Sequence, residues 1–479
     1  MAEESAARRA PAATGMPRLA IAGLSGESGK TLVSLALALE AGRRGVPVRA
    51  FKKGPDYIDA AWLKWASGHP ARNLDTHLMG FPAVQRSFAA HAIAGGWNLI
   101  EGNRGLYDGL DARGTHSTAE LAKTLHAPVI LVLNATKVTR TVAAMALGCQ
   151  RLDPEVPIAG VILNQVAGAR HERVVREAVE SACGLPVLGA IPRAPEGLLL
   201  STRHLGLVTP QEFAGRDDLA RNLLDRVARY LDFDLLLEAA SLAPPLAAPD
   251  LPPSTPLDGS DLTIGYLNDS AFSFYYPENL EALQASGAEV VAISALQSAA
   301  LPDSLDALYI GGGFPETHAQ ALSENTWFLA SLRRAARDGL PIYAECGGLM
   351  LLSRAITWRG TRYPMAGVLP CEAEMCAAPQ GHGYTELLVD TANPFFSDGA
   401  RLRGHEFHYS KLLVDGETPS SAAAVVRGAG SIAAGDGSSR RDGLLAGNVW
   451  ASYTHLHALA TPEWARGMIA AARHARVSA

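Results

Sequence analysis

Residues 19–34 read LAIAGLSGESGKTLVS, and this stretch limits the fold more than any other part of the 479-residue chain. An apolar run is followed by a glycine-rich turn and then by Gly29-Lys30-Thr31 at the head of an apolar, helix-like segment. A strand, a glycine-rich loop and a helix in this order are the context of a phosphate-binding loop, in which backbone N–H groups at the helix N-terminus surround a phosphate. The sequence therefore predicts a nucleotide-binding α/β domain.

Each residue type in this loop suits contact with ATP. Lys30 is expected to reach the β- and γ-phosphates, and the Thr31 hydroxyl to ligate Mg²⁺. The remaining expected ATP-binding residues are small: Gly23, Gly26, Ser28 and Gly29. The loop departs from the usual G-x-x-x-x-G-K-[ST] spacing, because Leu24 stands where the first glycine belongs and a glycine lies one position earlier.

Two further loops supply carboxylates at predicted strand ends. FKKGPDYIDAAWL carries Asp56 and Asp59, and NLIEGNRGLYDGL carries Glu101 and Asp108. In open α/β sheets ligands bind at the carboxyl ends of the strands, so these loops are expected to converge on the phosphates. Magnesium prefers hard oxygen ligands, which makes the carboxylates candidates for a metal site. Each of them taken alone could equally be a solvated loop residue.

The chain is predicted to hold two doubly wound α/β domains. Over residues 17–238, continuous apolar runs alternate with helical patterns, as in a parallel sheet that is buried on both faces. Residues 239–260 contain six prolines and are predicted to be an extended linker. Over residues 261–479, apolar runs again alternate with helical patterns. Residues 1–16 are expected to be a disordered tail.

Composition excludes several classes of protein. A net charge of −6, from 42 basic and 48 acidic residues, gives no reason to expect nucleic acid or an anionic membrane as partner. No apolar run approaches the roughly 18–20 residues of a membrane helix, and we expect a cytoplasmic protein. Five scattered cysteines without a C-x-x-C pair argue against a zinc site and a disulfide framework.

A second candidate site lies in the predicted C-terminal domain. PIYAECGGLMLLS reads as a strand, a sharp turn and a helix, an elbow that presents Cys346 as a nucleophile and whose helix dipole is expected to lower the thiol pKa. ALYIGGGFPE offers backbone N–H groups for an oxyanion hole. WASYTHLHA offers a histidine that could deprotonate the thiol.

These motifs occur in one order along the chain: the phosphate loop, GPDYID, EGNRGLYDG, FYYPENL, GGGFPE, AECGGLM, RGHEFHYS and SYTHLH. In this the chain resembles the cobyrinate a,c-diamide synthases over about residues 17–470. The resemblance implies an N-terminal ATP-dependent amidoligase domain, related to dethiobiotin synthetase, and a C-terminal class I-type glutamine amidotransferase domain. It implies that the a and c carboxylates of cobyrinate or hydrogenobyrinate become amides in cobalamin biosynthesis, using glutamine, Mg²⁺ and ATP.

The resemblance also assigns roles to matching residues. It implies that the Cys346 thiol attacks glutamine with His455 as its base. The glycines of the oxyanion and glutamine site would be Gly311, Gly312, Gly313 and Gly347. The metal neighbours would be Thr31, Asp56 and Glu101. The remaining residues of the ligase site would be Tyr57, Asp59 and Asp108.

The chain departs from the family pattern at two places. The usual amidotransferase has His-x-Glu, whereas this chain has His455 and His457 around Leu456, so the site is interpreted as a Cys–His dyad. The choice between the two histidines rests on the resemblance. Glu27 stands where the family usually has a small residue, which is acceptable beside phosphates only if the carboxylate points to solvent.

Several alternatives remain open at this stage. His405 and His408 of RGHEFHYS either shape a domain interface or substrate end, or are structural histidines. The tetrapyrrole could instead be sirohydrochlorin, its nickel chelate or sirohaem, and a homodimer is left open. A different class, the partitioning-type ATPases, would need K-G-G-x-G-K-T, but position 25 is serine.

Overall fold

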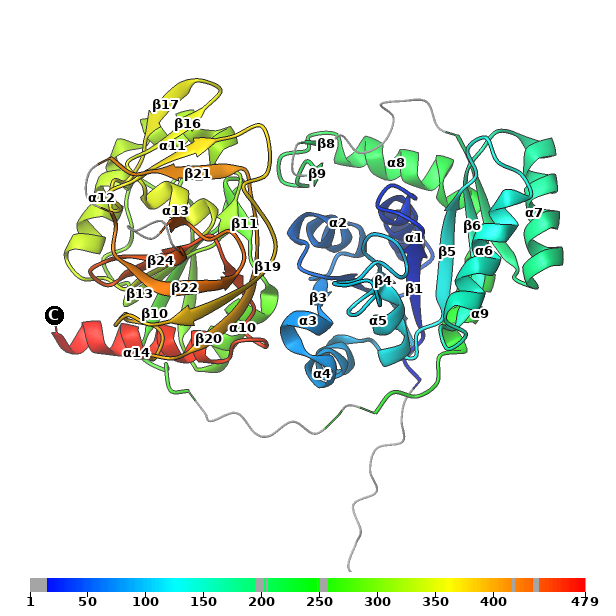
Figure 1. Cartoon of the computed structure of the whole chain (residues 1–479), viewed down its shortest axis with the longest axis horizontal. Coiled ribbons are helices and arrows are strands. Elements are labelled where there is room, and N and C mark those ends of the chain that lie inside the picture. Colours follow the sequence, from blue (N-terminus) through cyan, green and yellow to red (C-terminus); the bar gives the residue numbers. More distant parts are fainter. Residues whose placement is uncertain are drawn as a thin grey trace, which may run out of the picture. The chain divides into compact units, whose positions relative to one another are not determined.

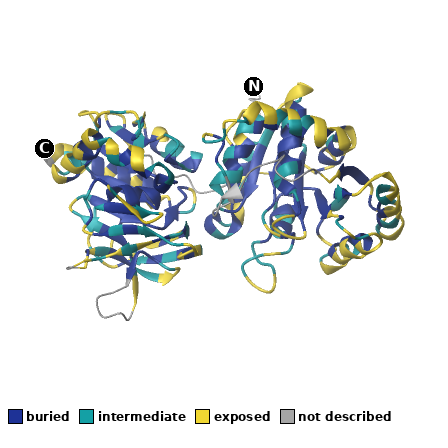
Figure 2. Cartoon of the chain, turned by 90° about the horizontal axis from the view of Figure 1, so that it is seen from above, coloured by how far each residue is buried: buried dark blue, intermediate teal, exposed yellow. Residues whose placement is uncertain are grey.

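The computed structural model describes residues 15–193, 202–203, 206–247, 249, 257–415, 418–433 and 439–478. The chain divides into two compact units, Met1–Pro252 and Pro253–Ala479 (Figure 1). Figure 2 shows that the strands inside each unit are buried, while the outward faces of the helices are exposed. We describe each unit by itself.

The first unit contains a seven-stranded sheet in which all neighbouring strands are parallel, in the order β3-β2-β4-β1-β5-β6-β7. Its strands are β1 (Arg18–Gly23), β2 (Val48–Lys53), β3 (Arg72–Leu74), β4 (Trp97–Glu101), β5 (Val129–Asn134), β6 (Ile158–Val166) and β7 (Val187–Pro192). All the apolar runs predicted as strands in this unit form strands, and the α/β prediction is confirmed. Because β2, β4 and β1 are neighbours, the loops that follow them leave the same edge of the sheet.

Helices pack on both faces of this sheet. Strand β1 shares one apolar core with α1, α2, α8 and α9, whereas α5, α6 and α7 contact β1, β5 and β7 outside that core. The helices are α1 (Lys30–Arg43), α2 (Tyr57–Ser67), α3 (Thr76–Met79), α4 (Phe81–His91), α5 (Thr118–Thr124), α6 (Thr141–Leu152), α7 (Ala169–Cys183), α8 (Arg216–Arg226) and α9 (Phe233–Ser241), with the 3-10 turn η1 (Ala228–Tyr230). Helix α1 is rich in Leu and Ala, which favour helices, and it ends just before Gly45.

The predicted tail lies largely, and the predicted linker partly, outside the described residues. Residues 1–14 of the tail and residues 248 and 250–256 of the linker are not described. Helix α9 extends to Ser241, so the first residues of the segment expected to be a linker are helical. Two short antiparallel strands, β8 (Thr202–Arg203) and β9 (Gly206–Leu207), precede α8.

The second unit contains a larger, mixed sheet in the order β12-β10-β13-β15-β25-β24-β22-β19-β20-β26, with β23 on β24. The strands from β12 to β25 are parallel, and those from β24 to β26 pair antiparallel. These strands are β10 (Thr263–Leu267), β12 (Glu289–Ile293), β13 (Ala307–Ile310), β15 (Ile342–Glu345), β19 (Gly381–Val389), β20 (Arg401–His408), β22 (Ser421–Arg427), β23 (Ile432–Ala433), β24 (Arg440–Ala446), β25 (Val449–Ser452) and β26 (His455–Leu456). The parallel half includes the strand predicted before Cys346, which is β15, and the antiparallel half was not anticipated.

Smaller sheets and helices complete the second unit. Its other strands are β11 (Phe272–Phe274) with β14 (Gly312–Gly313), and β16 (Ala355–Trp358), β17 (Thr361–Pro364), β18 (Glu372–Met375) and β21 (Ser410–Leu413). Its helices are η2 (Pro315–His318), α10 (Pro277–Ala285), α11 (Ala319–Glu324), α12 (Thr326–Arg337), α13 (Gly347–Leu352) and α14 (Glu463–Ser478).

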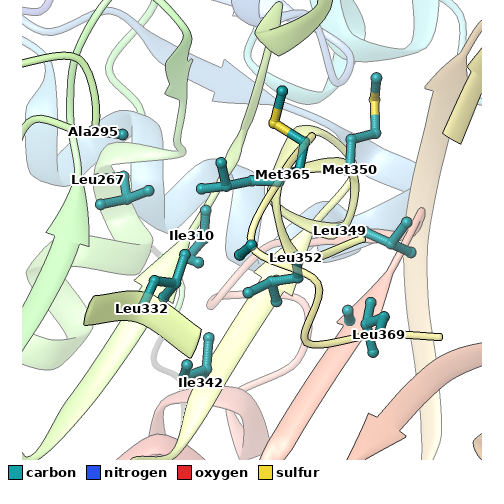
Figure 3. Packing of buried hydrophobic residues seen from close by; sticks show 14 of the residues in the cluster. Leu267, Ala295, Ile310, Leu332, Ile342, Leu349, Met350, Leu352, Met365 and Leu369 are labelled. Atoms are coloured by element: carbon teal, nitrogen blue, oxygen red, sulfur yellow. The ribbon is translucent and has the colours of Figure 1, made fainter. Parts of the chain in front are cut away.

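Helix α13 is anchored in the apolar core of this unit. Leu349 and Leu352 on α13 pack with Leu332 of α12 and with Ile310 and Ile342 of the sheet (Figure 3). Fully burying one such side chain contributes about 1.5–3 kcal/mol, so these contacts fix the short helix firmly against the sheet. None of the helices in the described part of the chain is long and apolar enough to cross a membrane.

Candidate active sites

The glycines of the loop between β1 and α1 allow a tight path for the chain. Gly29, directly before α1, has φ +101°, and a Cβ there would collide with the side-chain amide of Asn164. A Cβ on Gly23 would collide with Ser28, whose carbonyl accepts a hydrogen bond from Asn164 Nδ2 at 3.0 Å. Gly26 is exposed and has open space around it. The loop thus presents the N-terminus of α1 as the predicted phosphate site.

Lys30, the first residue of α1, is buried although it carries an ammonium group. Its Nζ donates to the Ser25 carbonyl at 2.7 Å. Burial, and secondarily the charge of Lys52, lowers the pKa of Lys30 to about 8. The two residues that departed from the expected pattern, Leu24 and Glu27, are both exposed, so the Glu27 carboxylate reaches solvent.

A buried charge network lies behind the loop. Glu101, at the end of β4, is fully buried, and its Oε1 accepts hydrogen bonds from Thr31 Oγ1 and Lys52 Nζ, each at 2.7 Å. Lys52 Nζ also donates to Asp59 Oδ2 at 2.6 Å. Lys52 stood in the quoted FKKGPDYID motif without a role, and the structure places it at the centre of the carboxylates that the sequence singled out.

The Glu101 side chain fits a magnesium site. Its second oxygen, Oε2, is buried and has no hydrogen-bond partner among the described residues, which is a costly state unless a cation or donor approaches. Burial raises the pKa of Glu101. Within the described ranges no group of three or more His, Cys, Asp or Glu forms a ready metal cage. Magnesium usually binds through one or two protein oxygens together with phosphates, so Thr31 and Glu101 suffice for such a site.

Asp56 and Tyr57 lie where β2 leads into α2. Asp56 caps α2, since its Oδ1 accepts a hydrogen bond from the backbone N–H of Asp59 at 2.9 Å. Burial, and then the nearby Asp59 carboxylate, raises the pKa of Asp56 to about 7. Tyr57 is the first residue of α2 and is half-buried. Asp56 thus has a structural role at the helix end, and its role as a metal neighbour stays a prediction.

Asp108 stabilises the loop that follows β4. Its Oδ2 accepts the backbone N–H of Gly105 at 2.8 Å, and the N–H of Leu106 donates to the Gly23 carbonyl at 2.7 Å. This second bond holds the Asp108 loop against the phosphate loop. The negative charge of Asp108 also acts on Lys30, raising its pKa against the effect of burial.

Cys346 occupies a strained turn between β15 and α13. It has φ +48° and ψ −98°, an unusual conformation for a residue with a side chain, and its N–H donates to the Ser452 carbonyl at 2.7 Å. The predicted lowering of the thiol pKa is wrong. Burial, followed by the charge of Glu316, raises the pKa of Cys346, while the N–H of Gly347 acts in the opposite direction. A buried thiol of this kind needs a base.

The glycines around Cys346 differ in what they can do. The N–H of Gly311 donates to the Tyr275 hydroxyl at 2.8 Å, so Gly311 is not a free oxyanion donor and that part of the prediction is corrected. Gly347 follows the thiol directly, and a Cβ on it would lie 3.1 Å from the Gly313 nitrogen. A Cβ on Gly312 would lie 2.6 Å from the His455 ring. The glycine loop therefore meets both the thiol turn and the histidine.

His455 and His457 have different surroundings. The Nδ1 atom of His455 lies 3.3 Å from Oε2 of Glu345, while its other side borders the glycine loop. His457 accepts the backbone N–H of Leu459 on Nδ1, and its Nε2 lies 3.6 Å from Glu278 Oε2. Of these two histidines, His455 borders the glycine loop that also meets the Cys346 turn, which favours His455 over His457 as the predicted base.

The other two histidines are buried within the second unit. The ring of His405 stacks on that of His455 with centroids 5.0 Å apart, and burial lowers the pKa of His405 well below its ordinary value. His408 Nδ1 lies 2.7 Å from the Ser410 carbonyl, and its ring stacks on Tyr453 at 3.6 Å. These contacts favour a structural role for both.

Sequence reasoning missed three functional candidates. They are Lys52 at the nucleotide site, Asn164 beneath the phosphate loop and Glu345 beside His455. Lys52 and Glu345 stood inside quoted motifs, next to residues that were assigned. Asn164 lies on β6 and reaches the loop only through the sheet, so no local signal marked it.

A phosphate loop with a buried acidic network, and a thiol elbow with a histidine, together define an ATP-using ligase coupled to a glutamine amidotransferase. Two family models match: the CobQ/CobB/MinD/ParA nucleotide binding domain over residues 19–206, and the CobB/CobQ-like glutamine amidotransferase domain over residues 263–463. The chain belongs to the cobyrinate a,c-diamide synthase family. It is a glutamine-dependent amide ligase, and its relatives support amidation in cobalamin biosynthesis.

Relatives named cobyrinate a,c-diamide synthase match along nearly the whole chain. The protein of Magnetococcus marinus is 44% identical over 455 residues, covering 94% of this chain and 96% of the relative. That of Dehalococcoides mccartyi is 41% identical, covering 95% and 97%. That of Archaeoglobus fulgidus is 39% identical, covering 95% and 97%. These relatives therefore argue against the alternative of a partitioning-type ATPase.

Proposed function

We propose that the protein converts the a and c carboxylates of cobyrinate, or of hydrogenobyrinate, to amides through acyl phosphates, using ATP, Mg²⁺ and glutamine. The observation that carries the proposal is the buried Thr31–Glu101–Lys52 network behind the phosphate loop, in a chain that also holds the Cys346 elbow. The network fits the binding of Mg-ATP, and the Cys346 elbow is not needed by a protein that only binds nucleotide.

The nucleotide site would activate the carboxylate. A carboxylate oxygen of the tetrapyrrole attacks the γ-phosphorus of ATP, ADP leaves, and an acyl phosphate forms. Lys30 would stabilise the charge on the transferred phosphoryl group, while Glu101 holds Thr31 and Lys52 in place. Bound magnesium, held by Thr31 and Glu101, would neutralise further phosphate charge.

The thiol site would supply ammonia. After His455 removes the thiol proton, the Cys346 sulfur attacks the side-chain amide carbon of glutamine to form a tetrahedral adduct. His455 returns the proton to the nitrogen, the C–N bond breaks, and ammonia leaves as the glutamyl thioester forms. Water then hydrolyses the thioester to glutamate and frees the thiol. Ammonia displaces inorganic phosphate from the acyl phosphate and so forms the new amide.

The identity of the tetrapyrrole is tested by direct product analysis. The enzyme is incubated with ATP, Mg²⁺ and glutamine together with cobyrinate, hydrogenobyrinate, sirohydrochlorin, its nickel chelate or sirohaem. We expect mass spectrometry to show two sequential exchanges of oxygen for NH on cobyrinate or hydrogenobyrinate. Exchange on one of the other three tetrapyrroles alone would replace the proposed substrate while leaving the amidation chemistry in place.

The roles at the thiol site are tested with two nitrogen donors. Cys346→Ala and His455→Ala should each lower glutamine-dependent amidation by at least about 10³-fold and leave ammonium-dependent amidation largely intact. His457→Ala is the matched control, since His457 is equally buried but faces Glu278, and should have a milder effect. Equal loss with both donors would reject the assignment of Cys346, and the reverse ranking of the histidines would exchange their roles.

A further inference from the structure

Glu345, the residue directly before Cys346, is a fully buried carboxylate whose hydrogen-bond partners include His455 and the residue that follows it. Its Oε1 accepts the backbone N–H of Leu456 at 3.0 Å. Its Oε2 accepts the Tyr309 hydroxyl at 3.0 Å and lies 3.3 Å from Nδ1 of His455. A buried carboxylate is tolerated only when donors satisfy it, and His455 is one of the three that do so.

This contact determines how the imidazole can act. If Nδ1 carries the proton and donates to Glu345, the lone pair is on Nε2. A Cβ on Gly312 would lie 3.3 Å from Nε2, and a Cβ on Gly347 would lie 3.4 Å from the Gly312 carbonyl carbon. The basic nitrogen therefore faces the glycine loop that also borders the residue after the thiol.

The chain segment around His455 is held from a second side. Asn279 Nδ2 donates to the Leu456 carbonyl at 2.9 Å, and its Oδ1 accepts the N–H of Ala458 at 2.7 Å. Asn279 Nδ2 also donates to the Tyr309 hydroxyl at 3.2 Å. Burial and the Glu345 charge raise the pKa of Tyr309 well above its ordinary value, so this hydroxyl stays protonated and donates to Glu345.

We propose that Glu345 is the positioning residue for His455, so that the glutaminase site works as a Cys346–His455–Glu345 triad whose carboxylate comes from the residue before the nucleophile. The inference rests on the roles proposed above for Cys346 and His455. With Glu345 as third member, a triad takes the place of the Cys–His dyad expected from the sequence. Asn279 belongs to the FYYPENL motif and holds the segment that follows His455, which links this motif to the thiol site.

In this triad His455 Nε2 takes the proton of the Cys346 thiol, and the sulfur forms a bond to the amide carbon of glutamine. The C–N bond breaks, and the Nε2 proton passes to the departing nitrogen, which leaves as ammonia. The Glu345 carboxylate holds the ring by Nδ1–H and stabilises the transient imidazolium. It contacts neither the substrate nor the reacting atoms.

The test compares Glu345→Gln with the two variants of the catalytic pair. Glutamine keeps the shape and an oxygen that can accept the Leu456 N–H, but it has no charge and presents an amide that favours the wrong tautomer of His455. We expect the glutamine-dependent kcat to fall by about 10²–10⁴-fold, since an analogous carboxylate-to-amide change in a serine protease triad costs about 10⁴-fold. We expect KM for glutamine and the ammonium-dependent rate each to change less than about threefold.

A second variant separates charge from packing. Tyr309→Phe removes one hydrogen bond to Glu345 while keeping its charge and its contact with His455, and should lower the glutamine-dependent kcat by less than about tenfold. Glu345→Gln with a normal glutamine-dependent kcat, with a defect in KM alone, or with equal loss for both nitrogen donors would overturn the triad. If Cys346→Ala or His455→Ala instead keeps full glutaminase activity, the roles proposed above for Cys346 and His455 are rejected. This outcome is distinct from rejection of Glu345 alone, in which both of these variants lose glutaminase activity and Glu345→Gln keeps it.

Discussion

At the scale of single residues, the burial of Lys30 conflicts with the positive charge that its role requires. Its ammonium must be charged to interact with phosphates, yet it is buried and bonded to the Ser25 carbonyl. Burial lowers its pKa to about 8, so part of the population is neutral at mildly alkaline pH. Binding of ATP should favour the charged form, because a phosphate replaces a neutral carbonyl as the partner.

This predicts a pH dependence of ATP binding. Because Lys30 is charged below its pKa of about 8 and neutral above it, ATP affinity should fall as the pH rises from 7.5 to 9.5, approaching tenfold per pH unit above the pKa. Isothermal titration calorimetry in buffers of different ionisation enthalpy would measure both the affinity and the proton taken up. Lys30→Ala should bind ATP weakly and with little pH dependence over this range. An affinity that is flat with pH in the unaltered enzyme contradicts the assignment.

The sequence located Cys346 but not its electrostatic surroundings. The strand-turn-helix pattern is local, so the elbow and its nucleophile could be predicted. The direction of the pKa shift could not, because it depends on Glu316 and on burial by distant segments. Glu345 was missed for the same reason: only the parallel register of β15 and β25, which pairs it with Ser452, brings it close to His455.

At the scale of elements, the convergence of the nucleotide-site loops was predictable from motifs alone. The glycine loop and the two acidic motifs each follow an apolar run, and the carboxyl ends of parallel strands share one edge. The order β2-β4-β1 then makes their loops neighbours. The antiparallel half of the second sheet was not predictable in this way. Strands β19 and β20 are separated by residues 390–400, and polar residues interrupt the apolar positions of β19, β20 and β24, so these strands do not show the continuous apolar runs of buried parallel strands.

The loop after β4 carries a prediction about Asp108. Asp108→Asn keeps an oxygen that can accept the Gly105 N–H, so the loop should hold its shape while one negative charge is lost. If the proposed tetrapyrrole, a polycarboxylate, binds beside this loop, the Asp108 carboxylate would repel it, so we expect Asp108 to act on magnesium or on incoming ammonia and not in substrate binding. Turnover with ammonium as donor should therefore fall about 10- to 100-fold, the range for a charged interaction of 1.5–3 kcal/mol.

Steady-state kinetics with ammonium would measure this effect without the glutaminase. Apparent KM values for ATP and the tetrapyrrole should change little in Asp108→Asn. In Asp108→Ala the loop also loses its internal hydrogen bond, and KM for ATP should rise because the loop rests on Gly23 of the phosphate loop. Unchanged turnover in the Asn variant, or a defect confined to substrate affinity, would make Asp108 an ordinary loop carboxylate.

At the scale of the whole molecule, each unit has an apolar core of its own. One core joins β1 to the surrounding helices of the first unit, and others join the sheet of the second unit to α12, α13 and α14. Nucleotide would bind only to the first unit. A ligand that binds the folded state alone stabilises it by RT ln(1 + [L]/Kd), which is about 2.7 kcal/mol at 100 times Kd.

We therefore expect two unfolding transitions in differential scanning calorimetry, and Mg–ATP should raise the midpoint temperature of only one of them. For a unit of this size, 1 kcal/mol corresponds to roughly 2–4 °C, so the affected transition should move by about 5–10 °C at 100 times Kd. Lys30→Ala should remove the shift and thereby assign the transition to the first unit, while Cys346→Ala should keep it. A single transition that Mg–ATP shifts as a whole would mean that the two units unfold as one. A shift that survives in Lys30→Ala would mean that the nucleotide binds somewhere other than the loop between β1 and α1.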